Sequence, residues 1–119
     1  MSSRTTYDLE DRLIQFAAQI CLLIDRFPTT AIARHVATQL MRSGTSPFAN
    51  YGEAQAAESR QDFIHKLKVC LKELRETQAW LKFADRMNLC PEIIEAARRE
   101  CDELVAIFVA SVRTAASKM

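Results

Sequence analysis

Two glutamates, Glu73 and Glu76, have the type and spacing that acid–base chemistry requires. They lie three residues apart, so on a helix both carboxylates share one side and could act as general acid and base or bind a pair of metal ions. A di-iron bundle also needs Glu-x-x-His on two helices, and the sequence contains no Glu-x-x-His. We therefore expect both glutamates to be paired with a cation, supplied by Arg42, Arg75 or a neighbouring subunit.

The other polar residues do not form a catalytic or metal-binding motif. His35 and His65 lie far apart in the sequence, and only His65 has a second potential ligand, Asp62, one helical turn away. No Gly-x-Ser-x-Gly marks a nucleophilic serine, and two glycines are too few for a phosphate-binding loop. We expect no enzyme activity, no catalytic residue, no metal and no cofactor.

Composition and charge predict one cytoplasmic domain of 119 residues. The net charge of +1 gives no global electrostatic reason to bind nucleic acid or a membrane. No apolar run approaches the roughly 20 residues that span a bilayer, and the first residues lack the apolar stretch of a signal peptide. The cysteines lack metal-binding spacing, so we expect reduced thiols that pack as small apolar residues. They are Cys21, Cys70, Cys90 and Cys101.

Apolar residues spaced three and four apart predict four helices, and the scarcity of glycine and proline argues against a sheet. Short connections make neighbouring helices antiparallel, so we predict an all-α, antiparallel up-and-down four-helix bundle in a single domain, 1–119. The ends before Tyr7 and after Ala115 are expected to fray. The predicted helices span about 8–26, 29–57, 59–87 and 91–116.

Three residues guide the expected helix boundaries. Gly44 and Pro47 predict a kink or a break in the second helix, and one bent helix and two short helices remain open alternatives. Pro91 is expected at the first position of the last helix, where its missing N–H has no helical partner in any case.

The third predicted helix has two apolar faces rather than one. The second follows heptad spacing and carries the only tryptophan of the sequence. A helix in a monomeric bundle needs one apolar face, so the second predicts a subunit interface. The alternative is that its last three members cover one end of the bundle. This second face comprises Val69, Glu73, Glu76, Trp80, Phe83 and Met87.

A basic stripe lies between the two apolar faces. Residues 59–87 hold seven Lys and Arg against four Asp and Glu, while the rest of the chain is slightly acidic. Such a stripe could contact the phosphates of RNA or DNA, although a solvated bundle surface has the same pattern and no exposed aromatic residue is interleaved for base stacking. The stripe comprises Lys68, Lys72, Arg75, Lys82 and Arg86.

Two blocks of sequence resemble a known family. Arg-Ser-Gly-Thr-Ser from position 42, followed by Ala-Asn-Tyr and Glu-Ala, resembles the signature of four-helix-bundle proteins encoded in intervening sequences of bacterial large-subunit rRNA genes. Segments 62–67 and 71–77, followed by Trp80-Leu81, look like the second block of that family, and the opening Tyr7-Asp8-Leu9-Glu10 and the late Asp102-Glu103-Leu104 also fit. The motif residues that we expect to be structural are Arg42, Ser43, Ser46, Asn50, Tyr51 and Glu53.

The resemblance implies a ring-shaped homo-oligomer, a pentamer, built from up-and-down bundles. The family is similar to the accessory proteins of diversity-generating retroelements, which form basic pentameric barrels that bind nucleic acid and a reverse transcriptase. We expect a non-enzymatic homo-oligomeric scaffold, and the alternative is an RNA- or DNA-binding accessory module that uses the basic stripe. The expected partners are copies of the chain itself and a nucleic acid or protein, but not a membrane.

Overall fold

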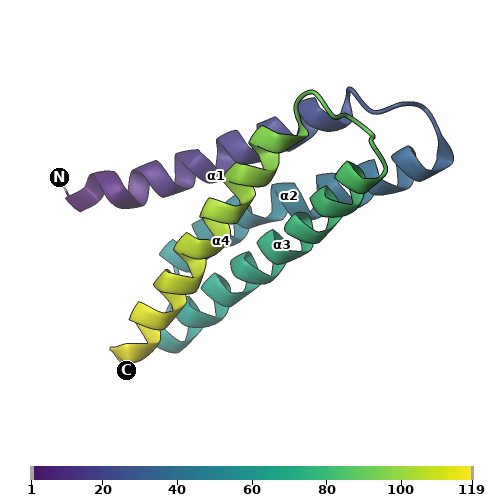
Figure 1. Cartoon of the computed structure of the whole chain (residues 1–119). Coiled ribbons are helices and arrows are strands. Elements are labelled where there is room, and N and C mark those ends of the chain that lie inside the picture. Colours follow the sequence, from purple (N-terminus) through teal and green to yellow (C-terminus); the bar gives the residue numbers. More distant parts are fainter. Residues whose placement is uncertain (1, 119) are drawn as a thin grey trace.

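The computed structural model describes the backbone of residues 2–118 and the side chains of residues 9–118. Four helices connected by short loops account for most of the described residues, which contain no strand. Figure 1 shows neighbouring helices running in opposite directions, so the predicted all-α up-and-down bundle is confirmed. The fraying of the chain ends stays a prediction. The helices are α1 (Ser2–Ile24), α2 (Ala31–Gln55), α3 (Arg60–Arg86) and α4 (Ile94–Ser117).

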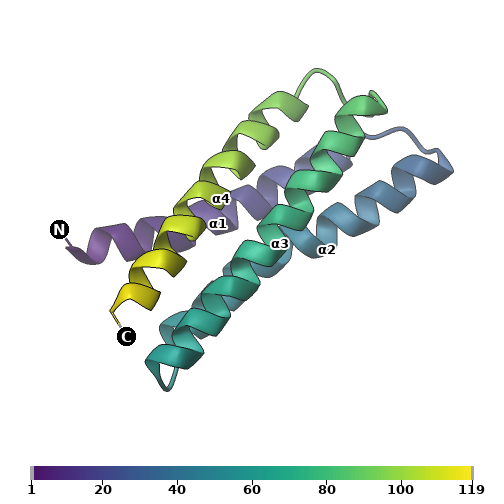
Figure 2. The same cartoon turned by 60° about the horizontal axis from the view of Figure 1, so that its bottom comes forward.

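The order of the helices around the bundle follows the order of the chain. α1 packs on α2, α2 on α3, α3 on α4, and α4 returns to α1. Among the described residues, no Cα atom of α1 approaches one of α3 within 8 Å, nor one of α2 one of α4, so each of these pairs occupies a diagonal. The α1–α4 contact is the least extensive, and α1 diverges from α4 towards its N-terminus (Figures 1 and 2). The α1–α4 side and the α2–α3 side therefore face away from each other.

Apolar side chains from all four helices form one core. The helical spacing of apolar residues puts one stripe of each helix inside, as the sequence predicts. Burying one large side chain of this kind stabilises the fold by about 1.5–3 kcal/mol. The fully buried members with the largest volumes include Phe16, Leu40, Leu74, Leu104 and Phe108.

α2 continues without a break through Gly44 and Pro47, so the alternative of two short helices is wrong. Pro47 has no N–H to donate, and one helical hydrogen bond to the carbonyl of Ser43 is lost. Gly44 serves packing between helices, because a Cβ atom there would lie 3.1 Å from side-chain carbons of the buried Ile20 on α1. The packing of α2 on both of its neighbours thus outweighs two local helix-breaking residues.

Side-chain hydroxyls cap the starts of α2 and α3. Thr30 accepts a hydrogen bond from the Ala33 N–H at 3.1 Å, and Ser59 accepts one from the Asp62 N–H at 3.0 Å. The prediction for Pro91 is wrong, because α4 begins three residues later at Ile94. The preceding Leu89 and Cys90 turn into the core, where they are 8% and 1% exposed, so the chain needs Pro91 and the next two residues for a turn.

The predicted bounds of the first helix are also too short at one end. α1 begins at Ser2 rather than near Asp8, and it ends at Ile24, two residues before the predicted end. Pro28 follows the α1 end within a short connection, in agreement with the rule that the residue before proline avoids helical angles.

Candidate functional site

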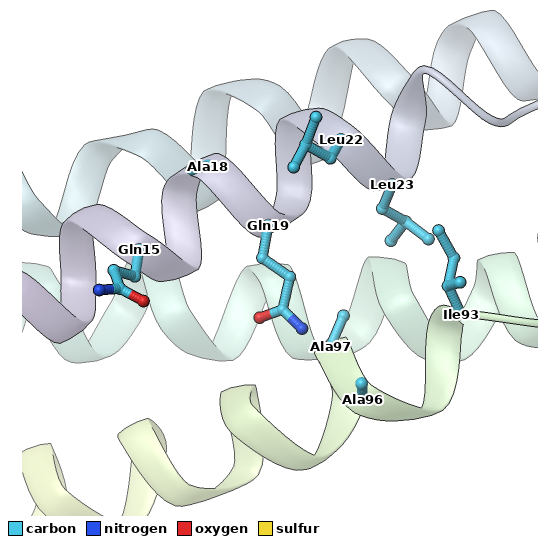
Figure 3. Close-up of a pocket in the computed structure, with 8 residues that line it drawn as sticks. All are labelled: Gln15, Ala18, Gln19, Leu22, Leu23, Ile93, Ala96 and Ala97. Carbon is cyan, nitrogen blue, oxygen red and sulfur yellow. The ribbon is translucent and has the colours of Figure 1, made fainter.

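A groove of about 440 Å³ lies between α1 and α4, at the end of the bundle where α1 stops and α4 starts. Figure 3 shows Gln19 reaching across from α1 towards Ala97, and Leu23 beside Ile93. The groove is mostly apolar, and its polar groups are two glutamine amides, so it lacks the charged groups that acid–base catalysis requires. We call it the α1–α4 groove; its lining is Gln15, Ala18, Gln19, Leu22, Leu23, Ile93, Ala96 and Ala97.

The aromatic end of the predicted second face of α3 lies against α2. The rings of His35 and Trp80 meet edge to face with centroids 5.6 Å apart, and Trp80 and Phe83 meet in the same way at 6.0 Å. Trp80 is partly buried, whereas Phe83 is 41% exposed, Met87 44% and Ile32, one turn before His35, 46%. We call these five residues of α2 and α3 the α2–α3 face.

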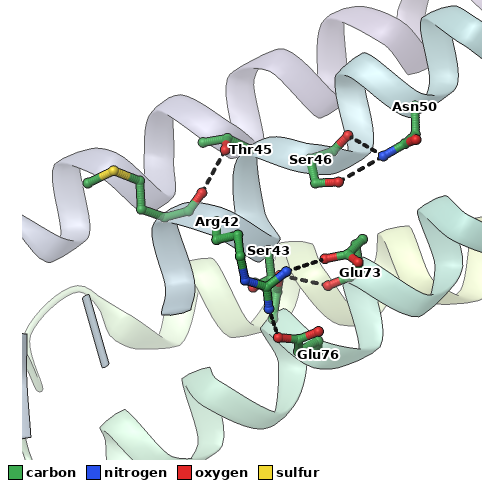
Figure 4. Close-up of polar contacts among 9 residues, drawn as sticks. Arg42, Ser43, Thr45, Ser46, Asn50, Glu73 and Glu76 are labelled. Atoms are coloured by element: carbon green, nitrogen blue, oxygen red, sulfur yellow. Dashed lines mark hydrogen bonds and ion pairs between the residues drawn. The ribbon is translucent and has the colours of Figure 1, made fainter. Parts of the chain in front are cut away.

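Arg42 on α2 binds both glutamates of the second face (Figure 4). Its Nη1 donates to Glu73 Oε1 at 3.2 Å, and its Nη2 donates to Glu76 Oε2. The Glu73 side chain is 13% exposed, so the guanidinium offsets much of the desolvation of that carboxylate. Of the partners that the sequence left open, Arg42 is the one used, while Arg75 is exposed. These carboxylates hold two helices together and are not free for acid–base chemistry.

The other motif residues predicted to be structural also lie on α2, and most of their side chains contact α3 or α4. The Ser43 and Thr77 hydroxyls share a buried hydrogen bond of 2.8 Å between α2 and α3, and Glu53 pairs with Lys66 of α3 at 3.0 Å. Within α2, Asn50 Nδ2 donates to the Ser46 Oγ at 2.8 Å and to its carbonyl at 3.1 Å (Figure 4). The Tyr51 ring meets Phe108 of α4 edge to face at 5.9 Å.

Among the polar contacts between helices that sequence reasoning missed are those of Thr77 and Arg12. Thr77 was not foreseen as the buried partner of Ser43, although it follows the buried Cys70 by seven residues and so shares its side of α3. Arg12 was not singled out at all. Its guanidinium donates to both carboxylate oxygens of Glu100, at 2.9 and 2.8 Å, and to Glu103 at 2.9 Å, so it ties α1 to α4. The bond to Glu100 is the largest cause that raises the pKa of Arg12 above its ordinary value.

The basic stripe lies on the exposed side of α3. All five of its side chains are exposed, and none forms an ion pair with another residue of the region 9–118. Their charges are therefore available to a partner, and phosphate binding by the stripe stays a prediction. The residues are Lys68, Lys72, Arg75, Lys82 and Arg86.

The four cysteines are free thiols, and three of them are buried. Cys70 donates to the Pro47 carbonyl at 3.5 Å and Cys101 to the Leu74 carbonyl at 3.4 Å, so both thiols connect neighbouring helices. Burial raises the pKa of each of these two thiols to about 12, which leaves almost no thiolate for nucleophilic chemistry at neutral pH.

The described residues contain neither a metal-binding cluster nor a helix that could span a membrane. Among the described residues, no three His, Cys, Asp or Glu side chains converge as a metal site would require. None of the described helices is long and apolar enough to cross a membrane.

These features define an all-α four-helix bundle. The model of the 23S rRNA-intervening sequence protein family matches residues 7–110, and the chain belongs to this family. The family predicted from the two sequence blocks is thus confirmed.

Comparison with solved structures supports the same assignment. Four chains of known structure match. One is the crystal structure of a protein of unknown function from the S23 ribosomal protein family of Bacteroides thetaiotaomicron VPI-5482. It is 32% identical and superposes with a TM-score of 0.80, covering 87% of this chain and 97% of that chain. None of the curated proteins compared matches this chain.

Proposed function

We propose that the chain is a non-enzymatic scaffold that assembles with copies of itself through the α2–α3 face. The observation that carries this proposal is the exposure of three large apolar side chains of this face, Ile32, Phe83 and Met87, each more than two-fifths exposed. A contiguous apolar patch on a small bundle is unfavourable in water and usually marks an interface. The family resemblance adds the expected form of the assembly, a pentameric ring.

The composition of the α2–α3 face suits a contact between proteins. Aromatic residues and methionine are enriched at the centres of such interfaces. Trp80 is held by edge-to-face contacts on both sides, to His35 and to Phe83, so little side-chain entropy remains to be lost on association. The proposal places the scaffold in the cytoplasm, where its four free cysteines would stay reduced.

The solution mass tests this proposal. The wild-type chain is expected to have several times the 13.5 kDa mass of one chain in sedimentation or light scattering. Trp80→Ala and Phe83→Glu should each lower that mass, since they remove or charge the apolar contact. Met41→Glu is the matched control, because Met41 is 49% exposed but shares the side of α2 that carries Gly44 and meets α1. An oligomer of unchanged mass in both face variants would refute the proposal.

A second candidate function is RNA or DNA binding by the basic stripe. What favours it is that five exposed cations on one helix have no ion-pair partner in the region 9–118. Such a stripe contacts phosphates and carries no sequence information. Its contribution would be local, since the whole chain has a net charge of only +1.

A salt series separates this second function from the first. Labelled structured RNA and duplex DNA would be titrated with the chain from low to physiological salt. Phosphate contacts predict that log affinity falls with log salt by about one unit per contact, and Lys72→Gln with Arg75→Gln should flatten that slope. Lys66→Gln is the control, because Lys66 is already paired with Glu53. No binding even at low salt would exclude this function and leave the scaffold proposal untouched.

A further inference from the structure

A second hollow opens at the other end of the bundle, where α4 ends and α2 connects to α3 (Figures 1 and 2). Side chains from all four helices line it, and its volume is about 350 Å³. Pockets of this size are large enough to hold a small molecule. We call it the Arg60 pocket after a cation in its lining.

The interior of the Arg60 pocket is apolar and held in place by the core. Tyr51 and Leu67 form buried walls, and the Tyr51 ring packs edge to face on Phe108 with centroids 5.9 Å apart. Phe63 on α3 also lines the pocket and is only partly buried. An apolar group placed against these side chains would be removed from water, which favours its binding.

The polar part of the lining consists of cations and hydroxyl groups. The Arg60 guanidinium lies over the Phe63 ring, with its central carbon 5.9 Å from the ring centroid. Ser111, Thr114 and Lys118 also line the pocket, and their spacing of three and four residues puts them on one side of α4. Arg60 and Lys118 are exposed, and neither forms an ion pair with another residue of the region 9–118.

The charge of the Arg60 pocket favours an anion. No carboxylate is among the described side chains that line it. Asp62, close to Arg60 in the sequence, accepts a hydrogen bond from the Glu58 N–H at 3.4 Å and so lies at the α2–α3 connection instead. A guanidinium matches the geometry of a carboxylate or phosphate, and the hydroxyls of Ser111 and Thr114 can donate to the same head group. The α1–α4 groove, whose polar groups are two neutral amides, lacks this chemistry.

We infer that the Arg60 pocket binds a small amphipathic anion. Its head group lies between Arg60 and Lys118, and its apolar body, a short chain or a single ring, lies against Phe63 and Leu67. The inference does not depend on the proposed self-assembly, because Arg60 starts α3 whereas Phe83 and Met87 lie at the opposite end of that helix.

A titration of the wild-type chain with octanoate tests the inference. Octanoate combines a carboxylate with a short apolar chain, and a ligand of about ten non-hydrogen atoms should bind with a Kd of about 0.1–1 mM. The backbone amide chemical shifts of residues 60–67 and 110–118 should change until the site is saturated. Octan-1-ol lacks the charge and acetate lacks the chain, so each should bind at least about tenfold more weakly. Octyl phosphate in the same titration shows which head group the pocket prefers.

Two variants locate the site, each with a matched control. Arg60→Gln should weaken octanoate binding by about tenfold, since a hydrogen bond to a charged group is lost. Arg75→Gln removes the same charge from an exposed position of the same helix and should leave the affinity unchanged. Thr114→Phe should fill the pocket and abolish binding, whereas Thr38→Phe makes the same change at an exposed position outside the lining. Circular dichroism verifies the fold of all four variants.

Three results would overturn the inference. The first is the absence of saturable shifts at about ten times the expected Kd. The second is a set of shifts centred on Leu22 and Ile93, which would place octanoate in the α1–α4 groove. The third is an affinity that Arg60→Gln leaves unchanged or that octan-1-ol equals. The solution mass should be the same in Arg60→Gln as in the wild type, so failure here leaves the scaffold proposal intact.

Discussion

The hydroxyl groups of Ser43 and Thr77 lie 2.8 Å apart between α2 and α3, and neither side chain has exposed surface. The Thr77 hydroxyl also donates to the Glu73 carbonyl at 2.9 Å. A hydroxyl has one proton to donate, so Thr77 accepts the proton of Ser43 while it donates its own to the carbonyl. Two polar groups are thus satisfied inside an otherwise apolar contact.

Replacing Thr77 by valine should leave the Ser43 hydroxyl without its acceptor. The shape of the side chain is kept, so the expected loss of unfolding free energy, about 1–3 kcal/mol, reflects the unsatisfied buried hydroxyl. Ser43→Ala combined with Thr77→Val removes both groups and should lose less than the two single changes added together. Urea unfolding of the four proteins measures this coupling. Strictly additive losses would mean that the two hydroxyls do not depend on each other.

The sequence predicted the number of helices and most of their bounds because apolar periodicity is a strong local signal. It could not predict that Ser43 is buried, since this depends on how α2 and α3 are rotated against each other. Gly44 was misjudged for a related reason. Local rules treat glycine as a helix breaker, whereas here its missing side chain lets Ile20 approach α2.

Of the candidate site, the sequence likewise predicted one part and missed another. The pairing of Glu73 with Arg42 was among the alternatives because an isolated carboxylate in an apolar stripe needs a cation. The α1–α4 groove was not foreseen, because the three-and-four spacing that predicts the first helix does not include Leu22, which lies beside the apolar stripe in the cluster 20–24. Whether a leucine at the edge of such a cluster is covered depends on how closely α4 packs on α1, and here it is left 67% exposed.

The two glycines of α2 should respond in opposite ways to alanine. At Gly52 no atom lies within 4 Å of an added Cβ, so Gly52→Ala should stabilise the chain by about 0.5–1 kcal/mol through helix propensity. At Gly44 the new Cβ would lie 3.1 Å from the buried Ile20, and the strain should outweigh that gain by about 1–2 kcal/mol. Thermal unfolding of both variants decides the matter. Equal stabilisation at both positions would show that α1 can move away from α2 at no cost in free energy.

Asn88 ends α3 in a left-handed conformation, with φ 56°. Its N–H donates to the Asp85 carbonyl at 3.0 Å and the next N–H, of Leu89, donates to Ala84 at 3.1 Å, the pattern of a Schellman cap. Asn88→Gly should therefore raise the unfolding free energy by a few tenths of a kcal/mol to about 1, whereas Asn88→Val should lower it by about 1–2 kcal/mol. Chemical unfolding tests both. A stabilising valine would contradict the left-handed cap.

The buried thiols of Cys70 and Cys101 should make the fold sensitive to alkali. Burial raises the pKa of each from 9.0 to about 12, so the unfolded chain releases these protons at lower pH than the folded chain. Below pH 9 both states keep the protons and the contribution to stability is complete. Between pH 9 and 12 each thiol should lower the unfolding free energy by up to about 1.4 kcal/mol per pH unit.

The decisive comparison is between the slopes of unfolding free energy against pH, because lysines and tyrosines also titrate in this range. Cys101→Ala leaves a small cavity and lowers stability at every pH, but its unfolding free energy should fall less steeply above pH 9 than that of the wild type. Val105→Ala on the same helix provides the control, because it truncates a buried side chain without removing a titratable group and should leave the slope unchanged. Parallel curves for all three proteins would mean that the folded chain already admits water to Cys101 before it unfolds, and that the α3–α4 contact opens locally.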